Sequence, residues 1–361
     1  MNNLNIQYFL RSKPIEDALK DLEELGVYAK KHPDYPELYQ FNYDMIESSN
    51  HKNHPIVMEC RGIILNSNKN WEVVAYPFNR FCNAGENFNY EIDWSTARIQ
   101  EKFDGSLMIV YFYADKWQVA TRNSPNACGN VGNYDFTFAE LFWKTFMDLT
   151  YSSGKLIPCC TYMFELMSPF NRVVVEQKDN SLVLIGVRNN NNFQELNLDK
   201  CIFDEFLFVR SYSVRNLSNV ILAASKLNPL QQEGFVIVDD KFNRIKVKCP
   251  KYVLIHHMKD GFSTRRMIDL IKLGEKSELL SYFPEYLEEM RELERNIDIL
   301  VAEYEEFYNQ YSSIELQKDF AFKVKHVRFS GVLFSMRKGL VKSIREGFYR
   351  IATEKLEDVL T

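Results

Sequence analysis

The sequence has no long apolar run and no charged-then-apolar leader. Its longest apolar runs, such as Leu182 to Val187, are far shorter than the roughly 20 residues that a membrane-spanning helix requires. Its seven cysteines include no Cys-x-x-Cys pair, so a zinc ribbon is disfavoured and reduced thiols are expected. We therefore expect neither secretion nor membrane insertion, and a cytoplasmic protein instead.

The glycine-rich loops that bind nucleotide phosphates in many enzymes are also missing. Gly154-Lys155 has no upstream glycine and is not a P-loop. Gly129 and Gly132 do not open a helix after a strand, and His256-His257 lies beside no other metal-type cluster. Because these residues are expected to be loop glycines and surface histidines, any nucleotide chemistry must come from another motif.

What the sequence does contain is typical of a soluble globular chain with a substantial core. Its 361 residues are 46% hydrophobic and 26% charged, with a net charge of −5. Positive charge is concentrated between Lys241 and Lys251, where five of eleven residues are cations, whereas acidic residues dominate from Glu285 to Glu306. The basic stretch is typical either of a solvated edge strand or of a phosphate-binding patch.

The larger part of the chain, as far as about residue 255, has the pattern of an α+β domain with antiparallel sheets. A helix is predicted from Ile15 to Lys31, followed by loops rich in Pro and Asn as far as His54. Further helices are predicted at Phe136–Leu149 and Leu217–Ser225. Runs of β-branched and aromatic residues bounded by Asn, Asp and Gly predict strands at Arg61–Leu65, Trp71–Pro77, Leu107–Phe112, Trp117–Thr121, Tyr162–Leu166, Val173–Glu176, Leu182–Val187, Phe235–Val238 and Arg244–Val247.

The pattern changes after Tyr252. Apolar residues recur at alternating spacings of three and four from Met290 to Tyr311, which predicts an amphipathic helix whose opposite face carries Glu and Arg. Further helical pattern surrounds Phe334 to Ile344 and Phe348 to Leu360. We therefore predict two domains, residues 1–255 and an all-helical domain of residues 256–361. Because the stripe covers only about three heptads, we expect it to pack within the helical domain rather than to form a dimerising coiled coil.

The most informative segment is Glu101-Lys102-Phe103-Asp104-Gly105-Ser106, directly before a predicted strand. A lysine amine attacks phosphorus only after it has lost its proton, which requires desolvation or neighbouring cations. Asp104 is suited to orient a nucleotide or the amine, and Gly105 to let the backbone approach a ligand. A Lys-x-Asp-Gly string is short enough to occur by chance, so its weight depends on the segments that follow it.

Four further segments follow in order: Phe164-Glu165, Leu182–Val187, Glu233-Gly234-Phe235-Val236 and Ile245-Lys246-Val247-Lys248. Because side chains alternate along a strand, Lys246 and Lys248 are expected on one face, where two cations can neutralise a triphosphate. Glu165 is suited to hold a ribose hydroxyl, and Glu233 to bind a hydrated divalent cation. Taken singly, the lysines are also typical of an exposed edge strand and the glutamates of ordinary strand ends.

In this order the five segments resemble motifs I, III, IIIa, IV and V of the covalent nucleotidyltransferase superfamily of ligases and capping enzymes. Three stretches extend the resemblance to the RNA ligase 1 family of T-even phages, which are single-strand RNA ligases associated with tRNA repair. They are Glu59-Cys60-Arg61-Gly62 followed by Tyr76–Asn83, then Phe164–Val174 with its Pro-x-Asn-Arg element, and Lys246-Val247-Lys248 followed by Tyr252-Val253. The similarity extends with interruptions from about residue 35 to residue 258.

The resemblance implies a role for each matching residue. It implies that Lys102 becomes adenylylated and that Asp104 and Gly105 complete its motif. The residues that hold AMP and the phosphates would be Glu165, Lys246 and Lys248, with Arg61 on the triphosphate and Glu233 at the metal. Three further residues also match the family: Tyr252, Asn171 and Arg172.

Four positions depart from the family pattern. Arg80 and Arg122 stand where the family has lysines, which preserves charge but changes the donor geometry. Phe41 stands where the family has a tyrosine near ATP, so that stacking could survive but a hydroxyl hydrogen bond could not. Of the family's acidic pair in the helical domain, Gly274–Glu278 retains at best Glu278, which makes a second metal contact there weak.

The function that the resemblance implies is an ATP-dependent RNA ligase that works through lysyl-AMP and an adenylylated RNA 5′-end, with Mg²⁺ or Mn²⁺. Its implied partner is RNA with single-stranded ends, in particular tRNA nicked in the anticodon loop, with the helical domain supplying that preference. An end-healing kinase–phosphatase is the implied functional companion, and a phage or other viral origin would place the protein in host cytoplasm.

Two other functions stay open at this stage. A DNA ligase or an mRNA guanylyltransferase of the same superfamily usually carries a β-barrel after motif V, whereas the residues after Lys248 have helical periodicity. A non-catalytic RNA-binding protein would use the basic stretch alone, but it would have no need of the lysine, the glycine and two strand-end glutamates together.

Overall fold

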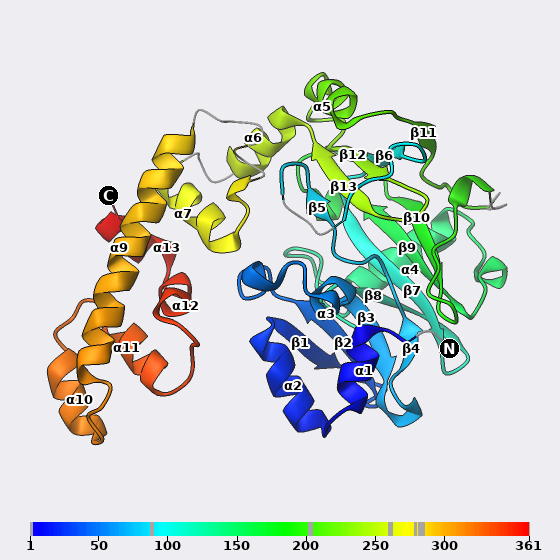
Figure 1. The fold of residues 1–361 in the computed structure, drawn as a ribbon. Helices are drawn as coiled ribbons and strands as arrows, with labels where there is room; N and C mark the ends of the chain where they lie inside the picture. Colours follow the sequence, from blue (N-terminus) through cyan, green and yellow to red (C-terminus); the bar gives the residue numbers. More distant parts are fainter. Residues whose placement is uncertain are drawn as a thin grey trace. The chain divides into compact units, whose positions relative to one another are not determined.

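The computed structural model describes residues 3–86, 90–200, 205–258, 263–277, 280 and 286–360. The chain divides into two compact units, Met1–His256 and His257–Thr361, and the predicted boundary near residue 255 lies beside this division. Within the described ranges, all strands belong to the first unit, and the second unit is helical (Figure 1). The predicted fold class, an α+β region with antiparallel sheets followed by helices, is confirmed.

The first sheet contains the amino-terminal strands. They pair antiparallel in the order β1 (Val27–Lys31), β2 (Leu38–Tyr43), β3 (Arg61–Asn66) and β4 (Glu72–Ala75). Helices α1 (Asn5–Arg11) and α2 (Ile15–Glu24), drawn in dark blue in Figure 1, bury their apolar residues in one core with this sheet. Ile63 and Leu65 of β3 are buried in this core, which fixes the position of Arg61 at the start of the strand.

The second sheet has the strand order β10-β9-β7-β8. Its strands are β7 (Ser106–Tyr113), β8 (Lys116–Thr121), β9 (Cys160–Met167) and β10 (Ser181–Asn189), all antiparallel. Helix α4 (Phe138–Asp148) begins with a capping box between Thr137 and Glu140, and its Phe142 and Phe146 pack on the sheet. This largely apolar core supports the strand on which Glu165 lies.

The third sheet carries the other predicted motif residues. Its order is β11-β6-β12-β13-β5, from the strands β5 (Cys82–Asn83), β6 (Arg98–Lys102), β11 (Ser211–Ser213), β12 (Gly234–Val238) and β13 (Arg244–Lys248). All pairs are antiparallel except β5 with β13. Helix α5 (Leu217–Ser225) packs on one face of this sheet together with Ile237 and Val247. The opposite face of β6 and β13 therefore presents Lys102, Lys246 and Lys248 on one side, as predicted for the two lysines of β13.

Short elements connect the sheets. They are α3 (Pro55–Glu59) and the 3₁₀ turns η1 (Ser49–His51), η2 (Ser67–Lys69), η3 (Ser153–Lys155), η4 (Pro169–Asn171) and η5 (Leu198–Lys200). Gly154-Lys155 thus lies in an isolated turn, which confirms that this dipeptide is not a phosphate-binding loop at the start of a helix.

Four segments differ from the predicted secondary structure. The helix predicted from Ile15 to Lys31 ends at Glu24, because Gly26 has a φ of 71° and the following residues pair with β2. Strand β2 lies where loops were predicted, since it is buried on both faces and shows no alternation. Strand β6 was missed because its sequence is mostly polar. The strand predicted at Val173–Glu176 is absent, because two of its backbone N–H groups donate to Asp104 instead of to a neighbouring strand.

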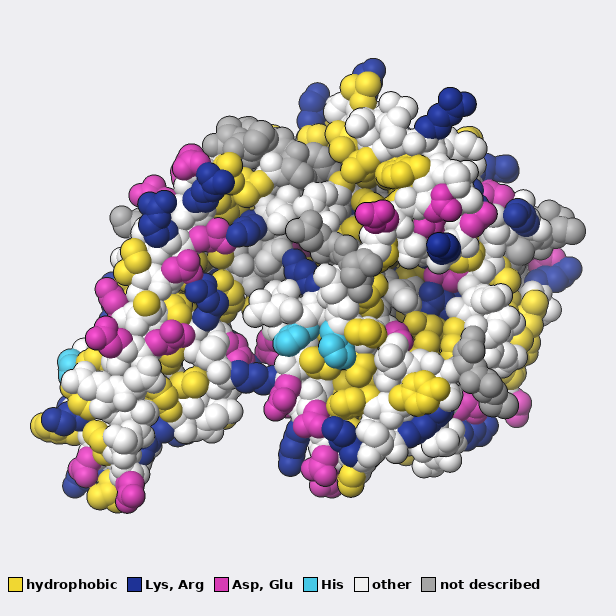
Figure 2. Space-filling model, viewed as in Figure 1, with side chains coloured by type: hydrophobic (Ala, Val, Ile, Leu, Met, Phe, Trp, Pro, Cys, Tyr) yellow, Lys and Arg dark blue, Asp and Glu magenta, His cyan; other side chains and the backbone are white. Residues whose placement is uncertain are grey.

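The second unit is organised around one long helix. Helix α6 (Pro250–Met258) spans the division, and α7 (Thr264–Leu273), α9 (Leu287–Tyr311), α10 (Gln317–Val324), α11 (Ser330–Arg337), α12 (Ile344–Tyr349) and α13 (Thr353–Leu360) follow. The apolar stripe of α9 packs on α7, α12 and α13, with Met290, Leu293 and Ile297 buried. This confirms that the stripe packs inside the helical unit. Figure 2 shows acidic and basic side chains interspersed along the exposed face of α9.

Two features of the second unit bear on the sequence predictions. The helical patterns predicted at 334–344 and 348–360 are each interrupted, because turns separate α11 from α12 and α12 from α13. Glu278, the weak metal candidate, lies outside the described residues.

No helix among the described residues is both long enough and apolar enough to cross a membrane.

Candidate active site

The first unit contains a cavity of about 820 Å³ with a strong excess of positive charge. Two of its lining residues are acids, Glu101 and Glu165, and Ile185 and Val236 give it apolar walls. Its cations come from four different strands and the loop after β8: Lys30, Arg61, Lys102, Arg122, Arg244, Lys246 and Lys248. A cavity with this charge and these walls is suited to a polyanion that carries a flat ring.

Lys102 lines this cavity and shares a carboxylate partner, Glu233, with Lys248. Its Nζ is 2.5 Å from Oε2 of Glu233, and the Nζ of Lys248 is 3.7 Å from Oε1 of the same carboxylate. The Glu233 side chain is only 5% exposed, while both lysine side chains are about a fifth exposed. One buried carboxylate therefore balances two amines that face a cationic cavity.

Strand register explains why these three side chains meet. Gly234 pairs with Lys102 on one side of β12 and with Lys248 on the other, so Glu233 lies between the two lysines. Gly234 has a φ of 157°, and a Cβ built there would lie 2.2 Å from the carbonyl oxygen of Val247. Only glycine permits this approach of the strands, which fixes the Lys102–Glu233–Lys248 arrangement.

Glu165 lies near Lys102 at the end of β9. Its Oε1 accepts a hydrogen bond from the backbone N–H of Gly105 at 3.1 Å. Burial raises the pKa of Glu165 to about 7, although the positive charges of Lys102 and Arg61 act against this rise. Gly105, which was predicted to allow close approach to a ligand, lines the cavity, and a Cβ at this position would lie 2.3 Å from the carbonyl oxygen of Leu166. A larger residue would not fit here, because the motif packs closely against β9.

Replacing Glu165 with glutamine is expected to stabilise the fold above pH 7. Because the pKa of the buried carboxyl is about 7, against 4.5 for an ordinary glutamate, the folded protein binds more protons than the unfolded chain between these values. Wild-type stability therefore falls as the pH rises through this window. Glutamine removes that loss and keeps the acceptor for Gly105, with a gain on the order of 2 kcal/mol.

Thermal unfolding of both proteins between pH 4 and pH 9 measures this effect. The two curves should approach each other toward pH 4.5 and separate toward pH 8, while the variant loses activity. A difference that does not change with pH would contradict the assignment of the raised pKa to Glu165.

Asp104 does not face the cavity, in contrast to the prediction that it orients a nucleotide or the amine. Its Oδ2 accepts the backbone N–H groups of Val174 and Val175 at 2.8 and 2.7 Å, and its Oδ1 accepts the hydroxyl of Tyr252 at 2.7 Å. Asp104 and Tyr252 are both buried. They act as a brace that holds the loop after Lys102 against the 173–176 segment and helix α6.

The two matched residues of the Pro-x-Asn-Arg element, Asn171 and Arg172, contact the polypeptide around the motif. Asn171 donates from Nδ2 to the Ser106 hydroxyl at 3.0 Å and to the Leu166 carbonyl at 2.8 Å, so it positions the start of β7. Arg172 is exposed and donates from Nε to the carbonyl of Val174. Neither residue lines the cavity, which makes them positioning residues for the motif rather than ligand contacts.

Three arginines, Arg61, Arg80 and Arg122, surround the side chain of Tyr43 near the cavity. Arg61 and Arg122 line the cavity, and the guanidinium groups of Arg80 and Arg122 lie 4.2 and 5.5 Å from the ring centre of Tyr43. Burial opposes ionisation of Tyr43, but Arg61, Arg122 and Arg80 outweigh it and lower the pKa of the phenol. Among the described residues, Arg61 Nη1 is buried without a hydrogen-bond partner. This donor is suited to a phosphate oxygen.

Two predicted ATP contacts are not at the cavity. Phe41 is completely buried and packs in the first core with Tyr39 and Trp71, so it cannot stack on a base in this conformation. Arg80 donates to the Ser48 hydroxyl and stacks on Tyr43, and it does not line the 820 Å³ cavity. Sequence reasoning missed Tyr43, although it is two residues from Phe41, because only the fold places three arginines around it.

The residues present fit ATP and a divalent cation. The cations supply charge for a triphosphate, and Ile185 and Val236 supply apolar surface for a base. Within the described residues, no three His, Cys, Asp or Glu side chains cluster as a self-sufficient metal site. Magnesium commonly binds through one or two carboxylates together with phosphate oxygens and water, and the Glu233 carboxylate beside Lys102 fits this mode. Glu233 would hold the cation.

Comparison with known proteins supports the same family. Residues 59–252 match a family model described as RNA ligase, of the T4 RNA ligase 1 type. An RNA ligase of Rhodothermus phage RM378 is 25% identical over 417 residues, which cover 95% of this chain and 94% of that protein. A protein of Autographa californica nuclear polyhedrosis virus assigned as a bifunctional polynucleotide kinase/RNA ligase is 30% identical over 271 residues, 69% of this chain but only 38% of the relative.

Solved structures show a weaker likeness. An archaeal ATP-dependent RNA ligase aligns with 80% of this chain and 78% of its own, at 12% identity and a TM-score of 0.44. The family match is stronger, because it covers more than half of the sequence and includes Lys102, Glu165, Glu233 and both lysines of β13. This chain therefore belongs to the RNA ligase family of the T4 RNA ligase 1 type.

Proposed function

We propose that this enzyme joins RNA ends through three displacements at phosphorus, with Lys102 as the nucleophile. The Lys102 amine forms a P–N bond to the α-phosphorus of ATP, and pyrophosphate leaves. The AMP passes to the 5′-phosphate of an RNA, and the lysine amine is released. An RNA 3′-hydroxyl then attacks the activated 5′-phosphorus, forms the new phosphodiester and expels AMP. The observation that carries this proposal is the place of Lys102 at a cationic cavity beside Glu233 and Lys248.

Catalysis of such displacements depends on positioning and on neutralising charge. Arg61, Lys246 and Lys248 would hold the phosphates, and Glu165 would accept a ribose hydroxyl. The cation at Glu233, Mg²⁺ or Mn²⁺, would supply Lewis-acid stabilisation of the phosphate oxygens. The Asp104–Tyr252 brace would keep the Lys102 loop rigid between steps.

Incubation with labelled nucleotide, followed by mass spectrometry, tests the proposal. ATP with magnesium should add one AMP to the peptide that contains Lys102, and the adduct should then be consumed by RNA with a 5′-phosphate. Transfer from GTP, or sealing of DNA ends alone, would instead favour an mRNA guanylyltransferase or a DNA ligase. Failure to exchange pyrophosphate with ATP under any metal would favour a non-catalytic RNA-binding protein.

We propose further that the helical unit binds RNA through the segment 317–350, called here the basic segment. It contains nine Lys or Arg residues and two acids, in a chain whose net charge is −5. Lys318, Lys323 and Lys325 are exposed, and among the described residues they form no ion pair. Phosphate contacts from such lysines give sequence-independent and salt-dependent affinity.

Reversing the charge of the three lysines together is expected to weaken joining of long structured RNA roughly 10- to 100-fold, because three phosphate contacts would be lost. Joining of short oligonucleotides should be unchanged. The matched control reverses Lys20, Lys69 and Lys116, which are exposed lysines of the first unit away from the cavity. Binding measured at several salt concentrations should show a shallower salt dependence only for the first variant. Equal effects of the two variants would contradict an RNA-binding role of the basic segment.

The natural substrate we propose is tRNA nicked in the anticodon loop, with repair as the biological role. We propose an end-healing kinase–phosphatase as functional companion, and the relative from Autographa californica nuclear polyhedrosis virus, assigned as a bifunctional polynucleotide kinase/RNA ligase, supports its kinase part. A nicked tRNA stem-loop competed against unstructured RNA of equal length tests the substrate preference.

A further inference from the structure

Three aromatic side chains form an exposed cluster in the first unit, called here the aromatic platform. The rings of Tyr134 and Phe136 stack with their centres 5.4 Å apart and their planes inclined by 20°. Phe170 meets both rings edge to face, with centres 5.0 and 5.3 Å away. Tyr134 is 45% exposed and Phe170 is 40% exposed, whereas Phe136 packs on the core of the second sheet. Large rings gathered at a surface in this way indicate a binding site.

The geometry of the three rings shows where a ligand could stack. Phe170 lies at nearly the same distance from both stacked rings, so it is beside the stack and not on its end. Phe136 is the inner end, because it packs on the core. The outer face of Tyr134 is therefore the other end of the stack. A flat ring of a ligand could extend the stack at this face.

A tight turn fixes the backbone that carries the two stacked rings. The N–H of Val131 donates to the carbonyl of Phe136, and the N–H of Tyr134 donates to the carbonyl of Val131, both at 3.0 Å. Gly132 has a φ of 57°, which this turn requires and which glycine adopts without strain. Because the turn is closed by its own hydrogen bonds, stacking on Tyr134 would cost little backbone ordering.

Both supports of the platform contact residues that line the active-site cavity. The N–H of Phe138 donates to the carbonyl of Gly129 at 3.0 Å, and both residues line the cavity. Phe136 is two residues from Phe138, or roughly 7 Å at about 3.3 Å per residue. Asn171, directly after the third ring of the platform, donates to the hydroxyl of Ser106, which also lines the cavity. The platform therefore lies at the rim of the active-site cavity.

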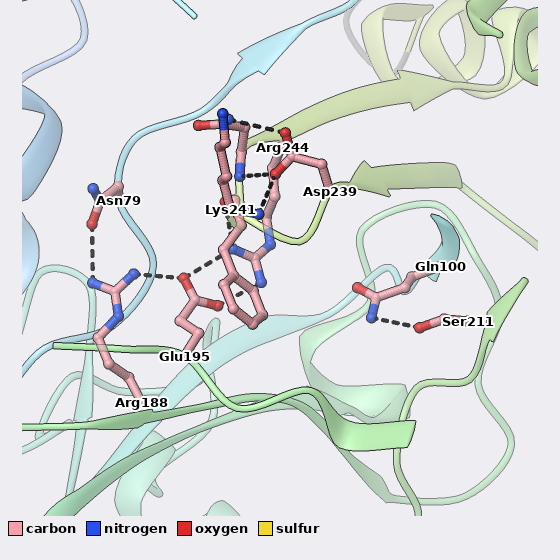
Figure 3. A network of polar contacts seen from close by, with 10 residues as sticks. Asn79, Gln100, Arg188, Glu195, Ser211, Asp239, Lys241 and Arg244 are labelled. Carbon is pink, nitrogen blue, oxygen red and sulfur yellow. Dashed lines mark hydrogen bonds and ion pairs between the residues drawn. The ribbon is translucent and has the colours of Figure 1, made fainter. Parts of the chain in front are cut away.

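Another part of the rim is engaged within the protein. Glu195 accepts hydrogen bonds from Arg188 at 2.5 Å and from Arg244 at 2.6 Å (Figure 3). Arg188 also donates to Asn79 at 3.0 Å, and Arg244 is the member of this network that lines the cavity. Because these guanidinium groups already bind protein oxygens, this part of the rim is less suited to an incoming strand than the exposed rings.

Charge alone would not hold RNA at the platform. Asp135 of the turn is exposed, and the exposed Arg172 pairs with Glu176 at 3.9 Å. Cations lie instead in the adjoining cavity, where Lys30 and Arg122 are among the lining residues. This arrangement suits a nucleotide chain whose phosphates contact the cavity and one of whose bases stacks on the rings at its rim.

We propose that the aromatic platform binds one base of the single-stranded RNA end that is being joined, by stacking on the outer face of Tyr134. The inference rests on the proposed function, because it names a binding site for the RNA of that reaction. Every base has a flat face, so the platform would position an RNA end without selecting its sequence. Unlike the basic segment, it would contribute affinity that depends little on salt.

Tyr134→Ala tests the proposal through the fluorescence anisotropy of a short labelled single-stranded RNA mixed with the full chain in the absence of ATP. Affinity should fall at least about fivefold, as expected for one lost stacking contact, and by the same factor at low and at high salt. Tyr134→Leu keeps an apolar side chain without an aromatic face and should lose as much. Tyr134→Phe keeps the ring and should bind within twofold of wild type. The matched control is Tyr8→Ala, because Tyr8 is an exposed tyrosine of α1 outside the cavity.

RNAs with a single abasic residue, placed at successive positions from each end, identify the contact directly. At one position, removal of the base should weaken binding to wild type and leave binding to Tyr134→Ala unchanged, because the ring and the base are partners in one interaction. Absence of such coupling at every position would overturn the proposal. Equal affinity of wild type and Tyr134→Ala for the intact RNA would overturn it as well.

A second measurement separates the platform from the chemistry at Lys102. Formation of the AMP adduct from ATP needs no RNA, so Tyr134→Ala should keep it within twofold while the KM for RNA in joining rises. Equal losses of adduct formation and of RNA binding would make the turn a structural support of the cavity and contradict a role in stacking. Anisotropy needs no turnover, so coupling between base and ring can be seen even if Lys102 forms no adduct.

Discussion

Replacing Lys102 with alanine is expected to abolish formation of the covalent AMP adduct from labelled ATP. The rate should fall by roughly 10⁴-fold or more, because the proposed nucleophile is removed. Joining of chemically adenylylated RNA should persist, because that step begins from an already activated phosphate. The measurement is gel detection of labelled protein, followed by a joining assay.

Three variants control this result. Lys116→Ala removes an exposed lysine of the second sheet and should leave the adduct at the wild-type level. Arg122→Ala removes one cavity cation among several, so adduct formation should weaken by roughly 10- to 100-fold without being lost. Lys102→Arg keeps the charge but not the nucleophile and should also form no adduct. An adduct of wild-type strength in Lys102→Ala would overturn the assignment of the nucleophile.

Replacing Glu233 with glutamine is expected to reduce both adduct formation and final joining by roughly 10²- to 10³-fold. Glutamine retains the shape of the side chain but removes the carboxylate that pairs with both Lys102 and Lys248, and with it the proposed cation ligand. Because the lost group would bind the metal, the apparent magnesium requirement should shift to higher concentration. Initial rates over a magnesium series measure both effects.

The control for this variant is Glu72→Gln, an exposed glutamate on β4 outside the cavity. Glu233→Gln should also leave the melting temperature close to wild type or lower it, because a buried carboxylate between two amines is removed. Unchanged rates and an unchanged magnesium requirement would exclude a metal role for Glu233.

Local patterns sufficed for much of the fold. Strands such as β9 and β10 are short apolar runs that include β-branched or aromatic residues, so their sequence predicts them directly. The stripe of α9 predicts a helix because its period is independent of what it packs against. For the site, Lys102, Glu165, Lys246 and Lys248 could be selected because their order along the chain matches a known family, and all four line one cavity.

Other features could not be read from local pattern. Strand β2 is buried on both faces and β6 is mostly polar, so neither shows the alternation that marks a strand. Asp104 lies in a motif that suggests ligand contact, yet its carboxylate braces the loop, and Gly105 lines the cavity but also packs against β9. Their roles depend on segments 60 to 148 residues away in the chain.

The amino-acid sequence alone determined the family and the types of residue available for phosphorus chemistry. The reason is that the order of the motifs along the chain can be recognised without knowing how they pack. Tertiary structure alone decided which charges meet: Glu233 between Lys102 and Lys248, Tyr43 among three arginines, and Glu195 between Arg188 and Arg244. The physical reason is that electrostatic interactions depend on distance and burial, and strand register sets both.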